Sequence, residues 1–268
     1  MWVREAYALF SANAYEGPWN QALKHDIPAP WTRVPIDPQL LDDPFTGLRA
    51  HVYHNYGLKE VVIAYAGTHV FDRRDWEAIE DIVRGRLPKQ VQRAQVVHDN
   101  VVSYLEKKGI RARISFTGHS LGGALAQYMA IIEKGSSAET FGAPGILGAL
   151  EDLANDYEPG YTYPVLNHVA YGDVIGLYGR HLGKVEHHIF DATDLMLPVL
   201  PLYLRSQLLL SFARGSYHAH TIDRYLAGFR RHHGKVCVPT GFQTYRNCKT
   251  YYQVKNFNDA GVAKKDYI

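Results

Sequence analysis

The chain has 268 residues, 46% hydrophobic and 21% charged, which is typical of one large globular unit with a full core. The formal net charge of +2 excludes the strongly basic balance of a general nucleic-acid-binding protein. No segment approaches the roughly 20 apolar residues of a membrane span. The N-terminus carries an acid at Glu5 and no long apolar core, so no signal peptide is expected. We expect a chain that is cytoplasmic or exported by a signal-independent route.

Helical and extended patterns alternate along the first half of the chain. The strand that ends at Ala66 is nearly continuous in apolar residues, which is typical of a strand buried on both faces by covering helices. The predicted elements are a helix over 3–15, strands over 47–56 and 60–66, and helices over 77–83 and 89–108. A proline-rich connector, which excludes a long helix, follows the first helix.

The second half continues this alternation. A β-branched and aromatic strand that begins at Ile114 runs into a helix rich in alanine and leucine. The further predictions are strands that end within 139–145 and run over 164–171 and 184–190, and helices over 146–155 and from about 217. Strands that alternate with helices in this way predict an α/β fold, with a mostly parallel central sheet and helices on both faces.

Two stretches near the C-terminus do not follow the alternation. An insert near residues 195–213 is strongly apolar, and Pro198 and Pro201 exclude a continuous helix at its start. Core packing with one buried helix and a lid or membrane-docking helix both fit this insert. Residues 235–268 are polar and tyrosine-rich. We expect them to form an irregular or β-hairpin appendage after a domain of residues 1–234.

A nucleophile motif stands between the strand and the helix that flank Ser120. The pattern Gly118-x-Ser120-x-Gly122 is the nucleophile elbow of serine hydrolases, in which a sharp turn lifts the serine hydroxyl off the sheet. Side chains two residues before and after the serine would collide with the neighbouring strand and helix, which explains the glycines. The flanking strand and helix are the context that the motif requires, so Ser120 is the predicted nucleophile.

A serine nucleophile needs a histidine to take its proton and a carboxylate to orient that histidine. In chains with this elbow, the acid and then the histidine follow the serine. Asp173 directly follows an apolar strand, so it should stand at the carboxyl edge of the sheet, with Asp191 and Asp194 as competitors. His220 opens a late helix and is the predicted base, with His218 as the second choice.

Acyl transfer also requires hydrogen-bond donors for the oxyanion that develops on the substrate. The backbone N–H of Leu121, immediately after the nucleophile, is one predicted donor. Thr68 follows Gly67 at the end of the buried apolar strand and supplies the second donor, to which its hydroxyl adds another. We therefore expect Thr68 and Leu121 to form an oxyanion hole.

The remaining histidines and the two cysteines form no metal motif. His119 is expected to point away from the serine along the turn. The pairs His187–His188 and His232–His233 are expected to be solvated and to be poor joint ligands, because adjacent strand residues face opposite sides. The chain has no His-Glu-x-x-His pattern and no cysteine cluster, so we expect no catalytic metal and no cofactor. Cys237 and Cys248 fit either a disulfide across a hairpin or two free thiols.

Three motifs occur in order along the chain: Tyr-Ala-Gly-Thr at 65–68, Thr-Gly-His-Ser-Leu-Gly-Gly-Ala-Leu-Ala at 117–126, and Thr-Phe-Gly-Ala-Pro at 140–144. Together they resemble the fungal-lipase-like, or class 3, lipases over roughly residues 47–225. The resemblance implies an α/β-hydrolase fold. It also implies hydrolysis of lipid esters, as by a triacylglycerol lipase or a phospholipase A1, through an acyl-serine intermediate and without a cofactor.

By position, the resemblance implies Ser120 as nucleophile, Asp173 as acid and His220 as base. The chain departs from the family pattern after the acid, where the family commonly has a proline and this chain has Val174 and Ile175. The family's lid usually follows the oxyanion turn, but here that stretch is charged, so the apolar insert is the alternative interfacial surface.

Three functions stay open on the sequence. The first is a lipase or phospholipase A1 that acts on lipid esters with transient contact to a membrane surface. The second is a soluble esterase, a thioesterase or an acyltransferase that uses the same triad. The third is a non-catalytic lipid-binding module, which the presence of Ser120, Asp173 and His220 together disfavours. All three take a lipid or ester ligand, and the sequence identifies no protein partner.

Overall fold

The structure is a computed structural model that describes residues 3–16, 25–67, 88–148, 156–170, 173, 175–188, 190, 220–231, 235–237 and 251–253. Within these residues, seven strands form one sheet, and their order across the sheet follows their order in the chain. They are β1 (Thr32–Arg33), β2 (Ala50–Asn55), β3 (Glu60–Tyr65), β4 (Arg113–His119), β5 (Ser137–Phe141), β6 (Val165–Ala170) and β7 (Lys184–His188). β1, β2 and β3 pair antiparallel, and the pairs from β3 to β7 are parallel.

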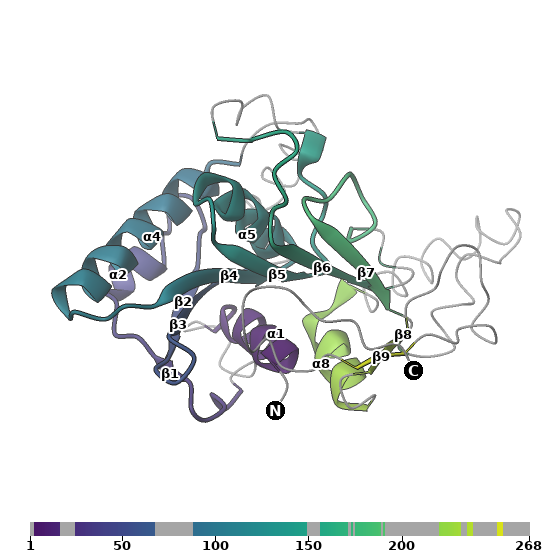
Figure 1. The fold of residues 1–268 in the computed structure, drawn as a ribbon, viewed down its shortest axis with the longest axis horizontal. Helices are drawn as coiled ribbons and strands as arrows, with labels where there is room; N and C mark the ends of the chain where they lie inside the picture. The colour runs from purple at the N-terminus through teal and green to yellow at the C-terminus, as the bar shows by residue number, and fades with distance from the viewer. Residues whose placement is uncertain are drawn as a thin grey trace, which may run out of the picture.

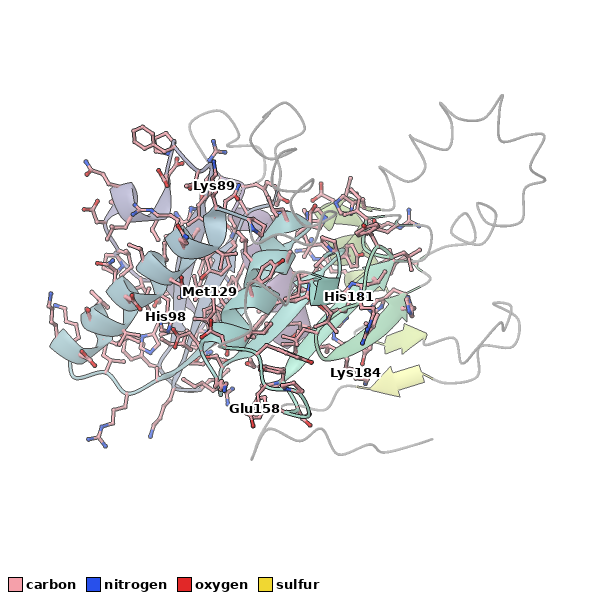
Figure 2. The ribbon with its side chains drawn as sticks, turned by 90° about the horizontal axis from the view of Figure 1, so that it is seen from above. Lys89, His98, Met129, Glu158, His181 and Lys184 are labelled. Carbon is pink, nitrogen blue, oxygen red and sulfur yellow. The ribbon has the colours of Figure 1, made fainter. Side chains whose placement is uncertain are left out.

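Helices cover both faces of the sheet (Figure 1). They are α1 (Val3–Asn13), α2 (Pro38–Leu41), α4 (Gln90–Lys107), α5 (Leu121–Ile132) and α8 (Ile222–Arg231). In Figure 1, α2, α4 and α5 lie above the sheet, and α1 and α8 lie below it. Figure 2 looks down on the upper layer, with Met129 of α5 between His98 of α4 and His181. The predicted α/β-hydrolase fold, a mostly parallel sheet between two helical layers, is confirmed.

Strand β3 shows why the central strands read as continuous apolar runs. Each of its residues is buried. Val61 and Ile63 pack into the core shared with α4 and α5, whereas Val62 and Ala64 pack into the core shared with α1 and α8. Successive strand residues face opposite sides, so a sheet covered twice needs apolar residues at every position.

Helix α1 is an integral part of the lower layer rather than a peripheral segment. Its side chains are largely buried, and two polar contacts fix it beneath β3 and β4. The hydroxyl of Tyr7 donates to Oε1 of Glu60 at 2.8 Å. Ser11 Oγ and Thr117 Oγ1 share a hydrogen bond of 2.9 Å. Both pairs are buried, so their hydrogen bonds are needed to offset the loss of water.

The predicted elements that fall on described residues agree well with the structure. The predicted ranges 3–15, 47–56, 60–66, 89–108, 164–171 and 184–190 contain α1, β2, β3, α4, β6 and β7. β1 and α2 lie in the proline-rich connector, where no element is predicted. Pro38 occupies the first turn of α2, where a missing N–H costs nothing.

The C-terminal region is described in part. β8 (Lys235–Cys237) pairs antiparallel with β9 (Tyr251–Gln253), in line with the hairpin alternative. Several predictions fall outside the described residues. They concern the helix over 77–83, most of the helix over 146–155, the insert near 195–213 and Cys248. The division into residues 1–234 and 235–268 stays a prediction. Among the described residues, no helix has the length and apolar character needed to cross a membrane.

Candidate active site

The turn between β4 and α5 holds Ser120 in a backbone conformation that residues other than glycine rarely adopt. Its φ is 57° and its ψ is −128°. A Cβ added to Gly118 would lie 2.3 Å from the carbonyl carbon of Gly122, and a Cβ added to Gly122 would lie 2.2 Å from the carbonyl oxygen of Tyr65. Helix α5 and the neighbouring strand β3 therefore leave no space for a side chain at either position.

Three side chains from distant parts of the chain meet at this turn. Ser120 Oγ lies 2.8 Å from Nε2 of His220, the residue that shortly precedes α8. Nδ1 of His220 lies 2.9 Å from Oδ1 and 3.0 Å from Oδ2 of Asp173, which follows β6. In the neutral tautomer that fits these contacts, Nδ1–H donates to the carboxylate and Nε2 accepts the serine proton. The structure thus brings the three predicted residues together in the order serine, histidine, carboxylate.

The carboxylate of Asp173 is fully buried and saturated with hydrogen bonds. Besides His220, it accepts the backbone N–H groups of Ile175 at 3.0 Å and Gly176 at 2.9 Å. The hydroxyl of Tyr225, on α8, lies 3.3 Å from Oδ2. A buried carboxylate is stable only when donors replace its lost water, and these donors also fix its orientation toward His220.

His119 contacts the base, which corrects the expectation that it points away along the turn. Its ring centroid lies 4.7 Å from that of His220, and its Nε2–H donates to the backbone carbonyl of His220. The carbonyl accepts only, so Nδ1 of a neutral His119 must be the acceptor, and the hydroxyl of Tyr15 donates to it at 2.8 Å. Burial, reinforced by the nearby His220, lowers the pKa of His119 from 6.5 to about 3. His119 is therefore a neutral support for the segment that carries His220.

The predicted oxyanion donors are described in part. Leu121 is the first residue of α5, where backbone N–H groups have no acceptor within the helix. Thr68 lies outside the described residues, but Gly67, just before it, is described. A Cβ added to Gly67 would lie 3.0 Å from Cβ of Ser120. The chain therefore passes directly beside the nucleophile as it enters Thr68.

Several other predicted residues are outside the described part of the chain. These are the second-choice base His218 and the competing acids Asp191 and Asp194, so their positions stay untested. Sequence reasoning missed both Tyr15 and Tyr225. Tyr225 follows His220 by five residues on the same segment, and that spacing is the signal that was available. Tyr15 lies 104 residues from His119, and no local pattern connects the two.

The prediction that the His187–His188 pair is solvated is wrong. His188 is 2% exposed, and His187 is half-buried on the opposite face of β7. The reason is that Phe229 of α8 packs against His188, so this face of β7 is covered, whereas the face of His187 is partly open. His232–His233 lies outside the described residues. Among the described residues, no grouping of potential metal ligands includes Ser120, Asp173 or His220.

One family of known proteins is similar to this chain. The family model "Phospholipase-like: Tle-like phospholipase domain" matches residues 6–156, which include the turn at Ser120 but neither Asp173 nor His220. No curated protein sequence matches the chain.

Solved lipases are similar to part of this chain at low identity. The Lip2 lipase from Yarrowia lipolytica is 15% identical, with a TM-score of 0.46 over 69% of this chain and 77% of that one. The lipase from Rhizopus microsporus var. chinensis is 17% identical, with a TM-score of 0.48 over 69% of this chain and 72% of that one. A Rhizomucor miehei lipase in complex with its propeptide is 14% identical, with a TM-score of 0.48 over 69% and 67%.

Proposed function

Because the chain belongs to the Tle-like phospholipase domain family, we propose that it cleaves a fatty-acyl ester of glycerophospholipids through an acyl-serine intermediate on Ser120. Family membership places it among lipid ester hydrolases of the lipase and phospholipase kind. The proposal adds the serine mechanism and the phospholipid class to that statement. The observation that carries it is the continuous relay from Ser120 through His220 to Asp173.

In the first half of the reaction, Ser120 attacks the ester carbonyl while His220 takes the hydroxyl proton. The 2.8 Å contact between Oγ and Nε2 is within the reach that proton transfer requires. Asp173 keeps the imidazole in the tautomer whose Nε2 is basic, and it stabilises the imidazolium that forms. The imidazolium then protonates the leaving alcohol, which is the lysophospholipid.

The oxyanion that develops on the carbonyl needs donors beside Ser120. The N–H of Leu121 lies at the N-terminus of α5, where the helix dipole also favours negative charge. We propose Thr68 as the second donor, because Gly67 brings the chain against Ser120 immediately before it. Water activated by His220 then hydrolyses the acyl-serine and restores the enzyme.

The substrate reaches this site from a lipid surface in our proposal. A long-chain phospholipid is presented by a bilayer or micelle, so the enzyme must make transient contact with that surface. The triad of Ser120, His220 and Asp173 suits any ester, so the family description is what favours phospholipids over triacylglycerols. The proposal does not require a protein partner or a cofactor.

Fatty-acid release from three substrates tests the proposal. Wild type, Ser120→Ala and Ser103→Ala are each given phospholipid vesicles, a triacylglycerol emulsion and a short p-nitrophenyl ester. Ser103 lies on the exposed face of α4, so its variant is the matched control. We expect release from the vesicles by wild type and Ser103→Ala, and a loss of about 10³-fold or more in Ser120→Ala.

The other outcomes select other functions. Release from the triacylglycerol alone makes the chain a triacylglycerol lipase, and release from the short ester alone makes it a soluble esterase. Thioester cleavage or acyl transfer to an added alcohol, lost in Ser120→Ala, selects a thioesterase or an acyltransferase. If nothing is cleaved and a serine-directed phosphonate fails to label Ser120, the chain is a non-catalytic lipid-binding module.

A further inference from the structure

A cluster of metal-ligating side chains lies beneath the sheet, away from Ser120. His168 stands on β6, and Glu186 and His188 stand two residues apart on β7, so both of them project from the same face. His168 pairs in register with Glu186, which brings all three side chains together. They are 0%, 5% and 2% exposed, and Phe229 of α8 contacts both imidazoles.

The distances within this cluster match those around a small divalent ion. Nδ1 of His168 accepts a hydrogen bond of 2.9 Å from Nε2–H of His188, so an ion bound by both nitrogens takes the place of that proton. Nδ1 of His168 also lies 3.9 Å from Oε2 of Glu186. The three residues each offer one ligand atom within 4.8 Å of the others. Around a tetrahedral zinc ion with bonds of about 2.0–2.1 Å, ligand atoms lie about 3.3–3.4 Å apart. The observed separations bracket that value, so small side-chain rotations bring the atoms into position.

A second carboxylate supports the histidine that forms the middle of the cluster. Nε2–H of His168 donates to Oε1 of Glu139 at 2.7 Å, which directs the other ring nitrogen toward His188 and Glu186. A ligating histidine typically donates its second N–H to a carboxylate, which fixes the tautomer and raises the basicity of the ligating nitrogen.

Glu186 is paired with two cationic side chains, but only one of these contacts is a hydrogen bond. Its Oε2 is buried and makes no hydrogen bond among the described residues, although its Oε1 accepts from Lys184 at 3.1 Å. Nη2 of Arg4 lies 3.2 Å from Oε2 without hydrogen-bond geometry, and Nη1 of Arg4 is also buried without a partner among the described residues. Arg4 and Oε2 of Glu186 therefore form a buried ion pair without a hydrogen bond, and a metal ion at Oε2 has to replace the guanidinium there.

We propose that His168, Glu186 and His188 bind a structural zinc ion. Two imidazole nitrogens and one carboxylate oxygen are a donor set for zinc and similar transition metals, whereas calcium and magnesium prefer oxygen alone. The two negative charges of Glu139 and Glu186 face the two positive charges of the ion and the one of Arg4. Arg4 competes with the ion for Glu186 and keeps its 3.5 Å contact with Glu139.

The ion joins β6 to β7 directly under α8. Phe229 contacts both ligating rings, so zinc binding stabilises the packing of the helix that follows His220. The site is independent of the proposed ester hydrolysis, because none of its ligands touches Ser120, His220 or Asp173 among the described contacts. Its test therefore reads zinc binding and stability rather than activity.

Zinc titration of the full-length, tag-free and chelator-stripped chain tests the site. Zn²⁺ competes against a chromophoric zinc indicator, and thermal unfolding is followed with and without Zn²⁺. We expect one ion per chain and, at a hundredfold excess over Kd, an approximately hundredfold shift of the unfolding equilibrium. His168→Gln and Glu186→Gln should each weaken binding by about 100-fold or more, and Glu139→Gln by about 10–100-fold.

Three further variants should strengthen zinc binding or leave it unchanged, and they make the test specific. Arg4→Gln removes the competing cation and should tighten zinc binding, whereas His187→Gln, on the other face of β7, should leave it unchanged. His98→Gln removes the second potential ligand group, formed with Asp99 and Glu133, and should also leave it unchanged. Binding that survives His168→Gln, or that is lost in His98→Gln, overturns the proposal.

X-ray absorption spectroscopy of the zinc-loaded wild type tests the site without the use of any variant. The proposal requires nitrogen and oxygen scatterers at about 2.0–2.1 Å with the multiple scattering of two imidazoles. A sulfur scatterer at about 2.3 Å would assign the ion to Cys237 or Cys248 and overturn it. Absence of stoichiometric zinc after titration overturns it as well.

Discussion

The hydroxyl of Tyr225 joins the acid of the proposed triad to the strand that precedes it. It lies 3.3 Å from Oδ2 of Asp173 and accepts the backbone N–H of Ala170, the last residue of β6, at 2.8 Å. Tyr225 is fully buried on α8, five residues after His220. One side chain from the segment that carries the predicted base therefore braces the predicted acid, so the relative position of the two does not depend on the intervening chain alone.

Tyr225→Phe should reduce stability and, to a smaller degree, activity. The variant keeps the ring but leaves the N–H of Ala170 buried without an acceptor, which costs about 1–3 kcal/mol of unfolding free energy. Urea denaturation at neutral pH measures this loss, and ester hydrolysis measures the effect on Asp173. Tyr56→Phe, on a 65% exposed tyrosine, is the matched control and should change neither quantity. Equal stability of the two variants would contradict the bracing role.

Asp173→Asn should abolish most catalysis and leave the fold intact. Its side-chain oxygen can still accept from Ile175 and Gly176, which preserves the turn. An amide that donates to Nδ1 of His220 would favour the wrong tautomer, and a triad altered in this way loses about 10⁴-fold in turnover. Steady-state hydrolysis of a short ester together with circular dichroism checks both halves. Asp26→Asn, on an exposed residue, controls for the change of charge.

The fold and the candidate nucleophile can be predicted from the sequence because each depends on contiguous residues. Apolar runs such as 60–66 show burial on both faces within one strand. The motif around Ser120 combines a strand, a turn and a helix in one short stretch. Asp173 and His220 could be predicted as partners from the order of strands and helices alone. An acid that follows a strand and a histidine that precedes a late helix reach the same edge of the sheet.

The supporting residues were not readable, because their contacts join segments far apart in sequence. Tyr15 and His119 are 104 residues apart, and no periodicity predicts that α1 lies under the elbow. The burial of His188 was missed for a different reason. The two-residue period shows that His187 and His188 face opposite sides, but whether a helix covers the second side depends on where α8 returns in the fold.

Acid should destabilise the protein in part through His119. Its pKa falls from 6.5 in the unfolded chain to about 3 in the folded one, mainly because of burial. Between these values the unfolded state binds one more proton, so this stability is fully present above about pH 6.5 and is lost as the pH falls toward 3. His119→Gln can keep both hydrogen bonds without titrating. Between pH 7 and pH 5 the wild type should therefore lose about 2 kcal/mol more unfolding free energy than the variant does. Urea denaturation of both proteins across that pH range measures this difference. Parallel pH curves would show that His119 does not contribute.

Gly122→Ala should disrupt the elbow far more than its single added methyl group suggests. That methyl would lie 2.2 Å from the carbonyl oxygen of Tyr65 and 2.7 Å from the carbonyl carbon of Ala66, which are backbone atoms that no rotamer change can move. Relief requires α5 to shift away from β3, and overpacking of this kind costs about 1–3 kcal/mol or more. Because Ser120 lies two residues away, the same shift misaligns Oγ with His220.

Gly148→Ala is the matched control, since an added Cβ there meets nothing within 4 Å. Thermal unfolding and phosphonate labelling of Ser120 should both fail or weaken in Gly122→Ala and stay unchanged in Gly148→Ala. Normal labelling in a destabilised Gly122→Ala would mean that the elbow geometry tolerates movement of the helix.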